Sequence, residues 1–396
     1  MIKQKNILII SNGHGEDLIA ANLVEEVLKK AKNKKINIGA LPIVGKGDHF
    51  QNLAVDILGP QNELPSGGFA RNSFVNLLND LRAGLLSNIY KQIKILKMSK
   101  NKYDLSVVVG DVYILLLTGF FKGGDIIFLP TAKSEYINSH YKVEKQIMKK
   151  YADIVLPRDQ KTKEDLVKHG VKADFFGNLM MDCFAIKKLD FNLEKNSIKI
   201  GILPGSRREA HQNMMDFINV IEELEKLKKD KYEFLTAVTN NFSNDKFRKK
   251  LLTLNWKVIK STNEHVRLKM QSKNGYSNVN IIYNGFGDVL DQAQLFIGMA
   301  GTANEQAAGM GKPVIIFPGT GAQFDYAFAV DQKRLLGEGV KFVERNFKNV
   351  AYSIIELLED NNEYQRRSKA GKKRMGDRGA IKKVAKLLYD SYLKSK

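Results

Sequence analysis

The stretch from residue 295 to residue 337 constrains the fold of this chain more than any other. A short apolar run at 295–297 gives way to small residues at 298–302, and a helical pattern follows that a glycine and a proline close. The β-branched run at 314–317 is typical of a buried strand. This order predicts two parallel strands joined by a helix. A glycine turn at a helix start can bind an anion through backbone N–H groups, or can serve only close packing.

A second glycine turn follows the strand predicted at 198–203. Its sequence is Pro-Gly205-Ser206-Arg207-Arg. Gly205 permits close approach of a ligand, Ser206 is expected to cap the next helix, and the guanidinium of Arg207 can clamp a diphosphate. The alternative is a surface arginine after an ordinary helix cap.

Polar residues also follow two strands predicted in the first half of the chain. The strand at 7–10 leads into Ser-Asn-Gly-His14-Gly-Glu16-Asp17 and a helix expected from about Leu18, and the strand at 105–109 ends in Gly-Asp111. A carboxylate directly after a parallel strand lies where open α/β sheets bind ligands. Glu16 and Asp17 could instead only cap the helix. The glycine spacing fits neither a dinucleotide fingerprint nor a Walker loop.

These motifs resemble the inverting GT-B glycosyltransferases, above all the lipid-A-disaccharide synthase family. The run Leu-Pro-Gly205-Ser206-Arg207 matches the signature of that family, and the Gly301-Thr302, Glu305 and Gly-Thr-Gly-Ala-Gln323 motifs resemble its C-terminal half. The likeness to the peptidoglycan N-acetylglucosaminyltransferase is looser and includes the glycine-flanked His14. The resemblance covers most of the chain.

The resemblance implies an α/β protein of the GT-B class, in which two Rossmann-like domains face a cleft. Residues 1–190 would form the acceptor-side domain and residues 198–375 the nucleotide-sugar donor domain. A terminal helix at 376–396 would cross back to the first domain. Between the domains, 186–197 is polar and lysine-rich and is expected to be a linker.

The resemblance also implies how the second domain holds a UDP-sugar. Glu305 would accept hydrogen bonds from the ribose hydroxyls, and Gln323 would lie near the donor sugar. The remaining donor-binding residues are expected to approach the diphosphate or, around Phe286, to hold the nucleobase. They are Gly205, Ser206, Arg207, Gly301, Thr302 and Phe286.

In the first domain, the resemblance implies a single inverting displacement in which a base deprotonates the acceptor hydroxyl. Asp111 is the expected base, or failing that His14 or Glu16. The sequence after the strand at 126–129 is Pro-Thr131-Ala-Lys-Ser, where the family has an aromatic loop. This departure leaves the acceptor open.

The net charge of +20 comes from 63 basic against 43 acidic side chains, and lysines spread along the chain provide most of it. Such a charge suits a solvated surface or an anionic membrane. Nucleic acid is not an expected partner, because an arginine-rich arm, zinc ligands and an aromatic RNA motif are all missing. The apolar and basic segment 64–95 predicts either core helices or a surface that associates with a lipid acceptor.

Cys183 is the single cysteine, so the chain cannot form an internal disulfide. The apolar run at 7–10 is too short for a signal peptide, and no apolar run reaches the roughly 18 residues of a spanning helix. We therefore expect a cytoplasmic protein, peripheral to a membrane where it acts on lipid. The sequence shows no dense Asp/His cluster for a metal, and the expected co-substrate is a UDP-sugar without a further cofactor.

The main interpretation is thus transfer of a sugar of the N-acetylglucosamine type from a UDP-sugar to a lipid or lipid-linked acceptor. One alternative is a UDP-N-acetylglucosamine 2-epimerase, which shares the fold and needs further acids and a histidine. Another is a non-catalytic protein that binds a nucleotide sugar or a membrane surface. Such a protein would keep Glu305 and Arg207 but would not depend on Asp111.

Overall fold

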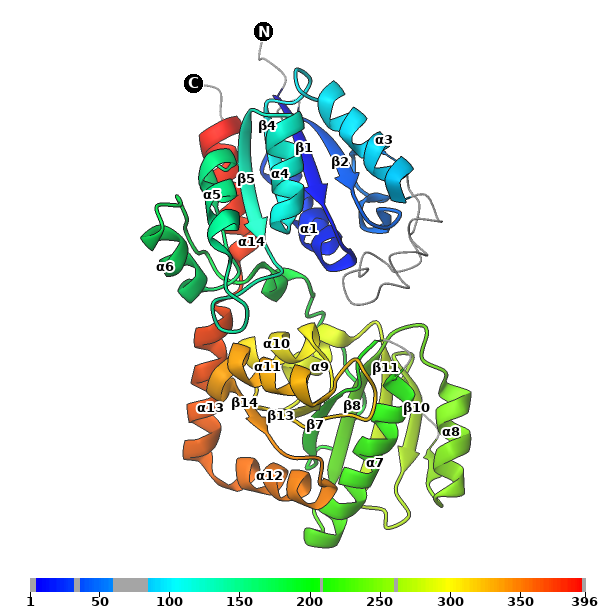
Figure 1. The fold of residues 1–396 in the computed structure, drawn as a ribbon. Helices are drawn as coiled ribbons and strands as arrows, with labels where there is room; N and C mark the ends of the chain where they lie inside the picture. The colour runs from blue at the N-terminus through cyan, green and yellow to red at the C-terminus, as the bar shows by residue number, and fades with distance from the viewer. Residues whose placement is uncertain (1–4, 32–35, 60–84, 207–208, 260–262, 394–396) are drawn as a thin grey trace. The chain divides into compact units, whose positions relative to one another are not determined.

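The computed structural model describes residues 5–31, 36–59, 85–206, 209–259 and 263–393. The chain forms two compact units (Figure 1). Unit 1 comprises Met1–Cys183 and Arg378–Lys396, and unit 2 comprises Phe184–Asp377. The polar segment 186–197, expected to be a linker, therefore belongs to unit 2, where the ring of Phe191 is buried.

Unit 1 is built on a parallel sheet in the order β3-β2-β1-β4-β5-β6. Its strands are β1 (Lys5–Ser11), β2 (Ile36–Pro42), β3 (Asp56–Ile57), β4 (Leu105–Gly110), β5 (Asp125–Pro130) and β6 (Ile154–Val155). Its helices are α1 (His14–Ala31), α3 (Leu85–Met98), α4 (Val112–Phe121), α5 (Lys142–Tyr151) and α6 (Gln160–Lys168), with the short 3₁₀ turns η1 (Asp48–Phe50) and η3 (Leu179–Asp182).

The central strands of unit 1, β1 and β4, are largely buried on both faces, because helices cover the sheet from two sides. Ile7 and Ile9 of β1 belong to one apolar cluster with α1. Leu8 and Ile10 point to the opposite face and join a second cluster with α4. The uninterrupted apolar run of β1 thus reflects two cores rather than one.

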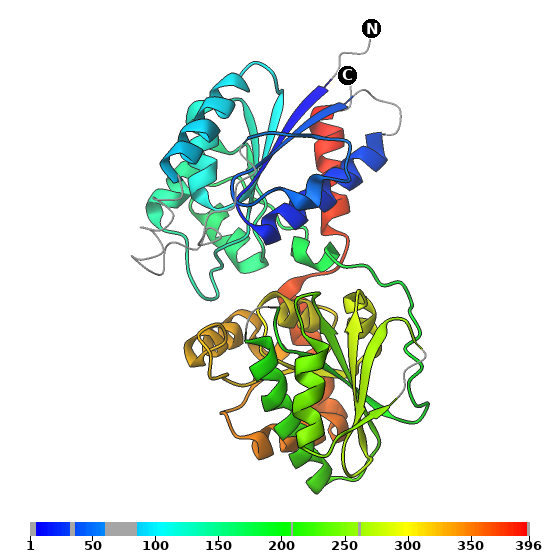
Figure 2. The same ribbon diagram turned by 90° about the vertical axis from the view of Figure 1, so that its right-hand side faces the viewer.

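The C-terminal helix α14 (Ala380–Leu388) and the π-helical turn η5 (Tyr389–Leu393) belong to unit 1. In Figure 2 the red α14 lies beside the blue α1, and its residue Val384 is fully buried in the cluster of α1. Asp182 fixes the start of this helix, because its carboxylate accepts the backbone N–H groups of Gly379 at 2.6 Å and Ile381 at 2.8 Å. The prediction that the terminal helix packs on the first domain is confirmed.

Unit 2 contains the longer sheet, in the order β14-β13-β12-β7-β8-β11-β10-β9. Its strands are β7 (Ile198–Leu203), β8 (Tyr232–Val238), β9 (Lys257–Ile259), β10 (Val266–Gln271), β11 (Ser277–Tyr283), β12 (Leu295–Gly298), β13 (Val314–Ile316) and β14 (Val340–Phe342). The pairings from β14 to β11 are parallel, whereas β10 is antiparallel to both β11 and β9.

Seven α-helices accompany this sheet among the described residues of unit 2. They are α7 (Ala210–Leu227), α8 (Asn244–Thr253), α9 (Phe286–Gln292), α10 (Thr302–Gly309), α11 (Tyr326–Leu336), α12 (Phe347–Glu359) and α13 (Asn361–Met375), with the 3₁₀ turn η4 (Gly337–Gly339). Phe217 of α7 is fully buried, and its ring meets that of Phe317 edge-on at 5.7 Å between centroids.

Local structure differs from the sequence-based expectation in two places. The segment 263–278 is polar in sequence, yet it contains the strand β10, which was not expected. Its apolar residues Val266, Leu268 and Met270 are buried and alternate with polar residues, which is the two-residue period of a strand with one covered face. The first helix begins at His14 rather than near Leu18, so the glycine turn before it is shorter than the sequence suggested.

The apolar and basic segment predicted at 64–95 falls partly outside the described residues, which resume with α3 at Leu85. Among the described helices, none combines the length and the apolar character that crossing a membrane requires.

Candidate functional site

The carboxyl edge of the unit 2 sheet gathers most of the predicted donor-binding residues. Strands β13, β12, β7 and β8 are consecutive neighbours and run parallel, so the loops after all four emerge at one edge. This is the edge at which open α/β sheets bind ligands.

Gly205 brings the loop after β7 against the loop after β12. Its backbone is left-handed, with φ of +84°, and a Cβ there would lie 3.3 Å from the carbonyl oxygen of Met299. Met299 in turn donates its N–H to the carbonyl oxygen of Leu203 at 2.9 Å. A side chain at position 205 would thus strain the turn and press on its neighbour.

The prediction that Ser206 caps the helix after β7 is wrong. Helix α7 begins at Ala210, and its N-cap residue is Glu209, whose side chain makes no capping hydrogen bond. Ser206 lies in the turn that precedes the helix and is exposed. Arg207, the expected diphosphate clamp, lies outside the described residues.

A cavity of about 460 Å³ opens at this edge. Its lining residues come from the start of α7, the end of β8 and the loops after β7, β8 and β13. They are Gly205, Ser206, Ala210, His211, Val238, Thr239, Asn241, Phe242 and Gln323. The rings of His211 and Phe242 stack at 4.2 Å between centroids. Three predicted donor-binding residues, Gly205, Ser206 and Gln323, therefore share one cavity.

His211 is neutral in this setting. Its Nε2 accepts the backbone N–H of Ser243 at 3.1 Å, which leaves the proton on Nδ1. Partial burial lowers the pKa of His211 below its ordinary value, and the nearby charge of Lys246 acts in the same direction. His211 was not among the predicted site residues, although it lines the cavity.

The start of α10 holds Gly301, Thr302 and Glu305. Gly301 is the N-cap and Thr302 is exposed, whereas Glu305 is 8 % exposed. Gln332 fixes the turn, because its side-chain amide donates to the carbonyl oxygens of Ala300 at 3.0 Å and Gly301 at 2.9 Å. The helix start is therefore held from behind by a buried side chain of α11.

Gln323 meets Glu209 across the site. The backbone N–H of Gln323 donates to both carboxylate oxygens of Glu209, at 3.1 and 3.3 Å, while its own side chain is exposed. The loops after β7 and β13 are thereby joined by a direct hydrogen bond. Glu209 was not among the predicted site residues.

Phe286 lies apart from this cavity. Its ring meets that of Phe184 edge-on at 5.9 Å between centroids, and it is not among the residues that line the cavity. The next residues hold the first segment of unit 2, since the Asp288 carboxylate accepts the N–H groups of Lys187 at 2.9 Å and Leu189 at 3.0 Å. The assigned contact of Phe286 with a nucleobase stays a prediction.

In unit 1 the equivalent edge lies after β1, β4 and β5, which are adjacent and parallel. Asp111 follows β4 and is the N-cap of α4, where its Oδ1 accepts the N–H groups of Tyr113 at 3.0 Å and Ile114 at 3.3 Å. This capping role accounts for the residue type at position 111. The Cα of Gly110 lies against the side-chain oxygen of Asn12, which ties the loops after β1 and β4 together.

Glu16 links the loops after β1 and β5. Its Oε1 accepts the hydroxyl hydrogen of Thr131 at 2.7 Å, and its carboxylate lies over Gly13, where a Cβ would come within 2.3 Å of Oε2. Arg158 donates to the carbonyl oxygen of Thr131 at 3.1 Å. Glu16 is thus positioned by two loops rather than used to cap α1.

His14 is the first residue of α1 and faces the loop after β2. A Cβ at Gly45 would lie 3.1 Å from its Cε1. The pKa of the neighbouring His49 lies below its ordinary value, because partial burial disfavours the charged imidazole and the charge of His14 adds to this effect. The histidines therefore stand on the β2 side of β1, and Asp111 stands on the β4 side.

Asp17 is a buried acid, for which the sequence left open both contact with a ligand and capping of the helix. It is 1 % exposed, and its Oδ1 accepts the hydroxyl hydrogen of Ser11 at 2.5 Å. Burial raises its pKa to about 6, although the bond from Ser11 and the charge of His14 oppose the rise. The sequence does indicate that Asp17 is buried, because its spacing places it on the same helical face as the apolar Ala20 and Val24.

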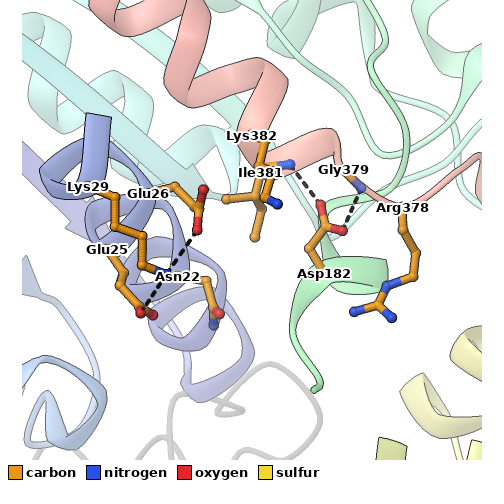
Figure 3. A pocket seen from close by; sticks show the side chains of 9 residues that line it. All are labelled: Asn22, Glu25, Glu26, Lys29, Asp182, Arg378, Gly379, Ile381 and Lys382. Carbon is orange, nitrogen blue, oxygen red and sulfur yellow. Dashed lines mark hydrogen bonds and ion pairs between the residues drawn. The ribbon is translucent and has the colours of Figure 1, made fainter. Parts of the chain in front are cut away.

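A second cavity, also about 460 Å³, lies between α1 and the start of α14 (Figure 3). Its acidic side chains already have partners. Asp182 caps α14, and Lys29 pairs with Glu25 at 2.7 Å and Glu26 at 3.1 Å. None of the predicted site residues lines this cavity.

Across the residues that the structure describes, His, Cys, Asp and Glu side chains nowhere gather in threes in a way that could hold a metal ion.

Comparison with known proteins identifies the fold. No protein-family profile matches the chain, and no curated protein sequence matches it. Solved structures do match over nearly the whole length. A UDP-GlcNAc 2-epimerase from Neisseria meningitidis, solved with UDP-GlcNAc bound, is 16 % identical with a TM-score of 0.59, over 98 % of this chain and 100 % of the other.

Two further structures are similar. MurG from Acinetobacter baumannii is 12 % identical with a TM-score of 0.59, over 98 % of this chain and 99 % of its own. The calicheamicin glycosyltransferase CalG4 is 12 % identical with a TM-score of 0.62, over 98 % of this chain and 100 % of its own. The chain therefore has the GT-B fold, which epimerases and glycosyltransferases share, and the predicted fold class is confirmed.

Proposed function

We propose that this protein is an enzyme that acts on a UDP-sugar, with the donor held by unit 2. The observation that carries the proposal is the cavity at the carboxyl edge of the unit 2 sheet, which Gly205, Ser206 and Gln323 line. The start of α10, with Glu305, belongs to the same edge. A solved protein of the same fold holds UDP-GlcNAc, which supports this class of ligand.

The chemistry common to this class begins at the anomeric carbon. The bond from that carbon to the diphosphate oxygen breaks, and its electron pair leaves with UDP. Backbone N–H groups at Gly301 and Thr302, together with Arg207, would stabilise the negative charge that develops on the diphosphate.

In a transferase, an acceptor hydroxyl attacks the anomeric carbon from the opposite face while its proton passes to a base. Because Asp111 serves as a helix cap, we propose Glu16 as the first candidate base, with Asp111 and His14 as alternatives. One oxygen of Glu16 accepts the Thr131 hydroxyl hydrogen, and this bond would orient the carboxylate toward its substrate.

The second candidate reaction is epimerisation at C2 of the sugar. A base removes the C2 proton as UDP leaves, and the resulting alkene takes up UDP again and a proton on its other face. Two observations favour this reaction. Several solved epimerases share the fold, and the edge of unit 1 carries Glu16, Asp111 and His14, which is more titratable groups than one displacement needs.

The same experiment tests both reactions. The protein is incubated with UDP-N-acetylglucosamine in D₂O and followed by ¹H and ³¹P NMR, with and without a lipid-linked sugar acceptor. Epimerisation exchanges the C2 proton for deuterium without an acceptor, whereas transfer releases UDP only when an acceptor is present and leaves C2–H intact. If the nucleotide neither binds nor changes, the proposed function is wrong.

We also propose a lipid or lipid-linked acceptor for the transferase reaction. Helix α4 exposes Tyr113, Leu116 and Phe120 at helical spacing, with Phe120 69 % exposed, and the neighbouring α3 carries Lys91 and Lys94. An apolar stripe beside lysines suits an anionic lipid surface. Sedimentation with phosphatidylglycerol vesicles, but not with phosphatidylcholine vesicles, would support this acceptor class, and loss of sedimentation in Phe120→Ser would place the contact.

A further inference from the structure

Glu209 is the N-cap residue of α7, but its side chain does not cap the helix. As the N-cap of α7 it could satisfy a backbone N–H of the first turn, yet it makes no such bond. Both of its carboxylate oxygens instead accept the N–H of Gln323, 114 residues further along the chain. The contact therefore joins two loops rather than completing a helix end.

The loop that receives Glu209 is shaped to fit it. The carboxylate lies directly over the Cα of Gly321, where a Cβ would come within 2.1 Å of the carboxyl carbon and 2.4 Å of both oxygens. Gly321 is not among the glycines with a positive φ. The absence of a side chain at position 321 thus allows the close approach of Glu209, and the path of the backbone does not itself call for glycine.

Other contacts hold the ends of the same loop. Gly319 donates its N–H to the carbonyl oxygen of Phe324 at 2.8 Å, and Asp325 caps α11 through the N–H of Phe328 at 2.8 Å. The tip of the loop, from Thr320 to Gln323, contacts the body of unit 2 through Glu209. Gln323 sits at that tip and lines the cavity.

We infer that Glu209 is a positioning residue of the donor site, which holds the backbone of Gln323 so that the Gln323 side chain faces the cavity beside Gly205 and Ser206. The effect on ligand binding rests on the proposed function, in which Gln323 would contact the sugar of a UDP-sugar and not its nucleotide. The hydrogen bond itself is a property of the free protein and can be tested without a ligand.

The first test is hydrogen–deuterium exchange of the full-length protein, read on a peptide that spans residues 318–325. Glu209→Ala removes the acceptor, so exchange at Gln323 should accelerate about tenfold. Glu209→Gln keeps a carbonyl oxygen and should stay close to wild type. Gly321→Ala should resemble Glu209→Ala, since its methyl group displaces the carboxylate. The control is Glu223→Ala, which removes a surface carboxylate of the same helix that pairs with Lys226.

The second test is titration calorimetry with UDP and with UDP-N-acetylglucosamine. Glu209→Ala and Gly321→Ala should weaken binding of the UDP-sugar about tenfold while changing that of UDP less than about twofold. Glu209→Gln should restore most of the sugar preference. Gln323→Ala should lose the same preference, and the double variant Glu209→Ala/Gln323→Ala should be no worse than Gln323→Ala alone.

The outcomes separate this inference from the proposed function. If wild type binds neither ligand, the proposed function fails while the exchange result still decides the role of Glu209. Unchanged exchange in Glu209→Ala overturns the inference, and so does equal weakening of UDP and UDP-sugar. Tighter binding of both ligands by Glu209→Ala would show that the carboxylate competes with the diphosphate, which also contradicts a positioning role.

Discussion

The carboxyl edges of the two sheets differ in their chemistry although both lie at the ends of central parallel strands. In unit 1 the first turn of α1 carries Glu16 and Asp17, and Asp111 follows β4, each carboxylate bonded to a backbone N–H or a hydroxyl. In unit 2 the loops after β7 and β12 carry Gly205 and Gly301, which have no side chain to hold a ligand away from the backbone. In the proposed function, the same topology would support two tasks, which are proton transfer in unit 1 and diphosphate binding in unit 2.

The largest expected effect comes from the first candidate base. Glu16→Gln keeps the size of the side chain and an oxygen for Thr131, but it cannot take a proton. If Glu16 is the base, turnover should fall by about 10²- to 10⁴-fold while the Kd for UDP changes little. Turnover is read from UDP release under initial-rate conditions. A matched fall in UDP affinity would contradict the division of tasks between the two edges.

Asp17 provides the next largest effect, on stability as a function of pH. Its pKa is 3.8 in the reference state and about 6 in the folded protein, so between these values the folded state binds more protons than the unfolded state. The free energy of unfolding therefore falls as the pH rises from about 4 to 6, by up to about 3 kcal/mol. Above pH 6 this loss is complete.

Asp17→Asn removes that titration. Urea unfolding at pH 4 and at pH 7 should show wild type losing stability relative to Asp17→Asn by up to about 3 kcal/mol over this interval. Glu25→Gln, which alters an exposed carboxylate of the same helix that pairs with Lys29, is the control and should follow wild type. A difference between Asp17→Asn and wild type that does not change with pH would mean that Asp17 is ionised throughout.

Glu305 tests the unit 2 edge in the same way. UDP at about a hundred times its Kd should raise the free energy of unfolding of wild type by about 2.7 kcal/mol. Glu305→Ala should lose most of this increment because the ribose hydroxyls lose their acceptor, and comparing each variant with and without UDP cancels any change in intrinsic stability. Thermal unfolding is the measurement. An increment that survives the substitution would remove Glu305 from the nucleotide site.

Much of this arrangement could be predicted from sequence because it depends on local patterns. Apolar runs with glycine turns indicated β7, β12 and β13, and the family resemblance indicated the terminal helix α14. The strand β10 has equally regular alternation, but it was hidden by its lysine and arginine residues, which lie on the partly exposed face. The charged residues of β10 thus concealed the two-residue alternation that is typical of a strand.

The side-chain partners could not be predicted, because they join residues far apart in the chain. Glu209 contacts Gln323 over 114 positions, and Glu16 contacts Thr131 over 115. Such pairs depend on the order of strands in the sheet, which places loops from distant parts of the sequence at one edge. Asp111 shows the converse. Its partners are the next residues in the chain, so its role as the N-cap of α4 could have been assigned from the sequence alone.

Asp111 gives the smallest expected effect and the sharpest test of whether a cap can also be a base. Asp111→Ala removes the acceptor for Tyr113 and Ile114 and should cost about 1 kcal/mol of stability in urea unfolding, whereas Asp111→Asn keeps that oxygen and should cost only a few tenths. If capping is its whole role, Asp111→Asn should also keep more than about a tenth of wild-type turnover. A fall of a hundredfold or more at unchanged stability would return the proton-accepting role from Glu16 to Asp111. The base would then be the carboxylate that follows β4, and not the one in the helix that follows β1.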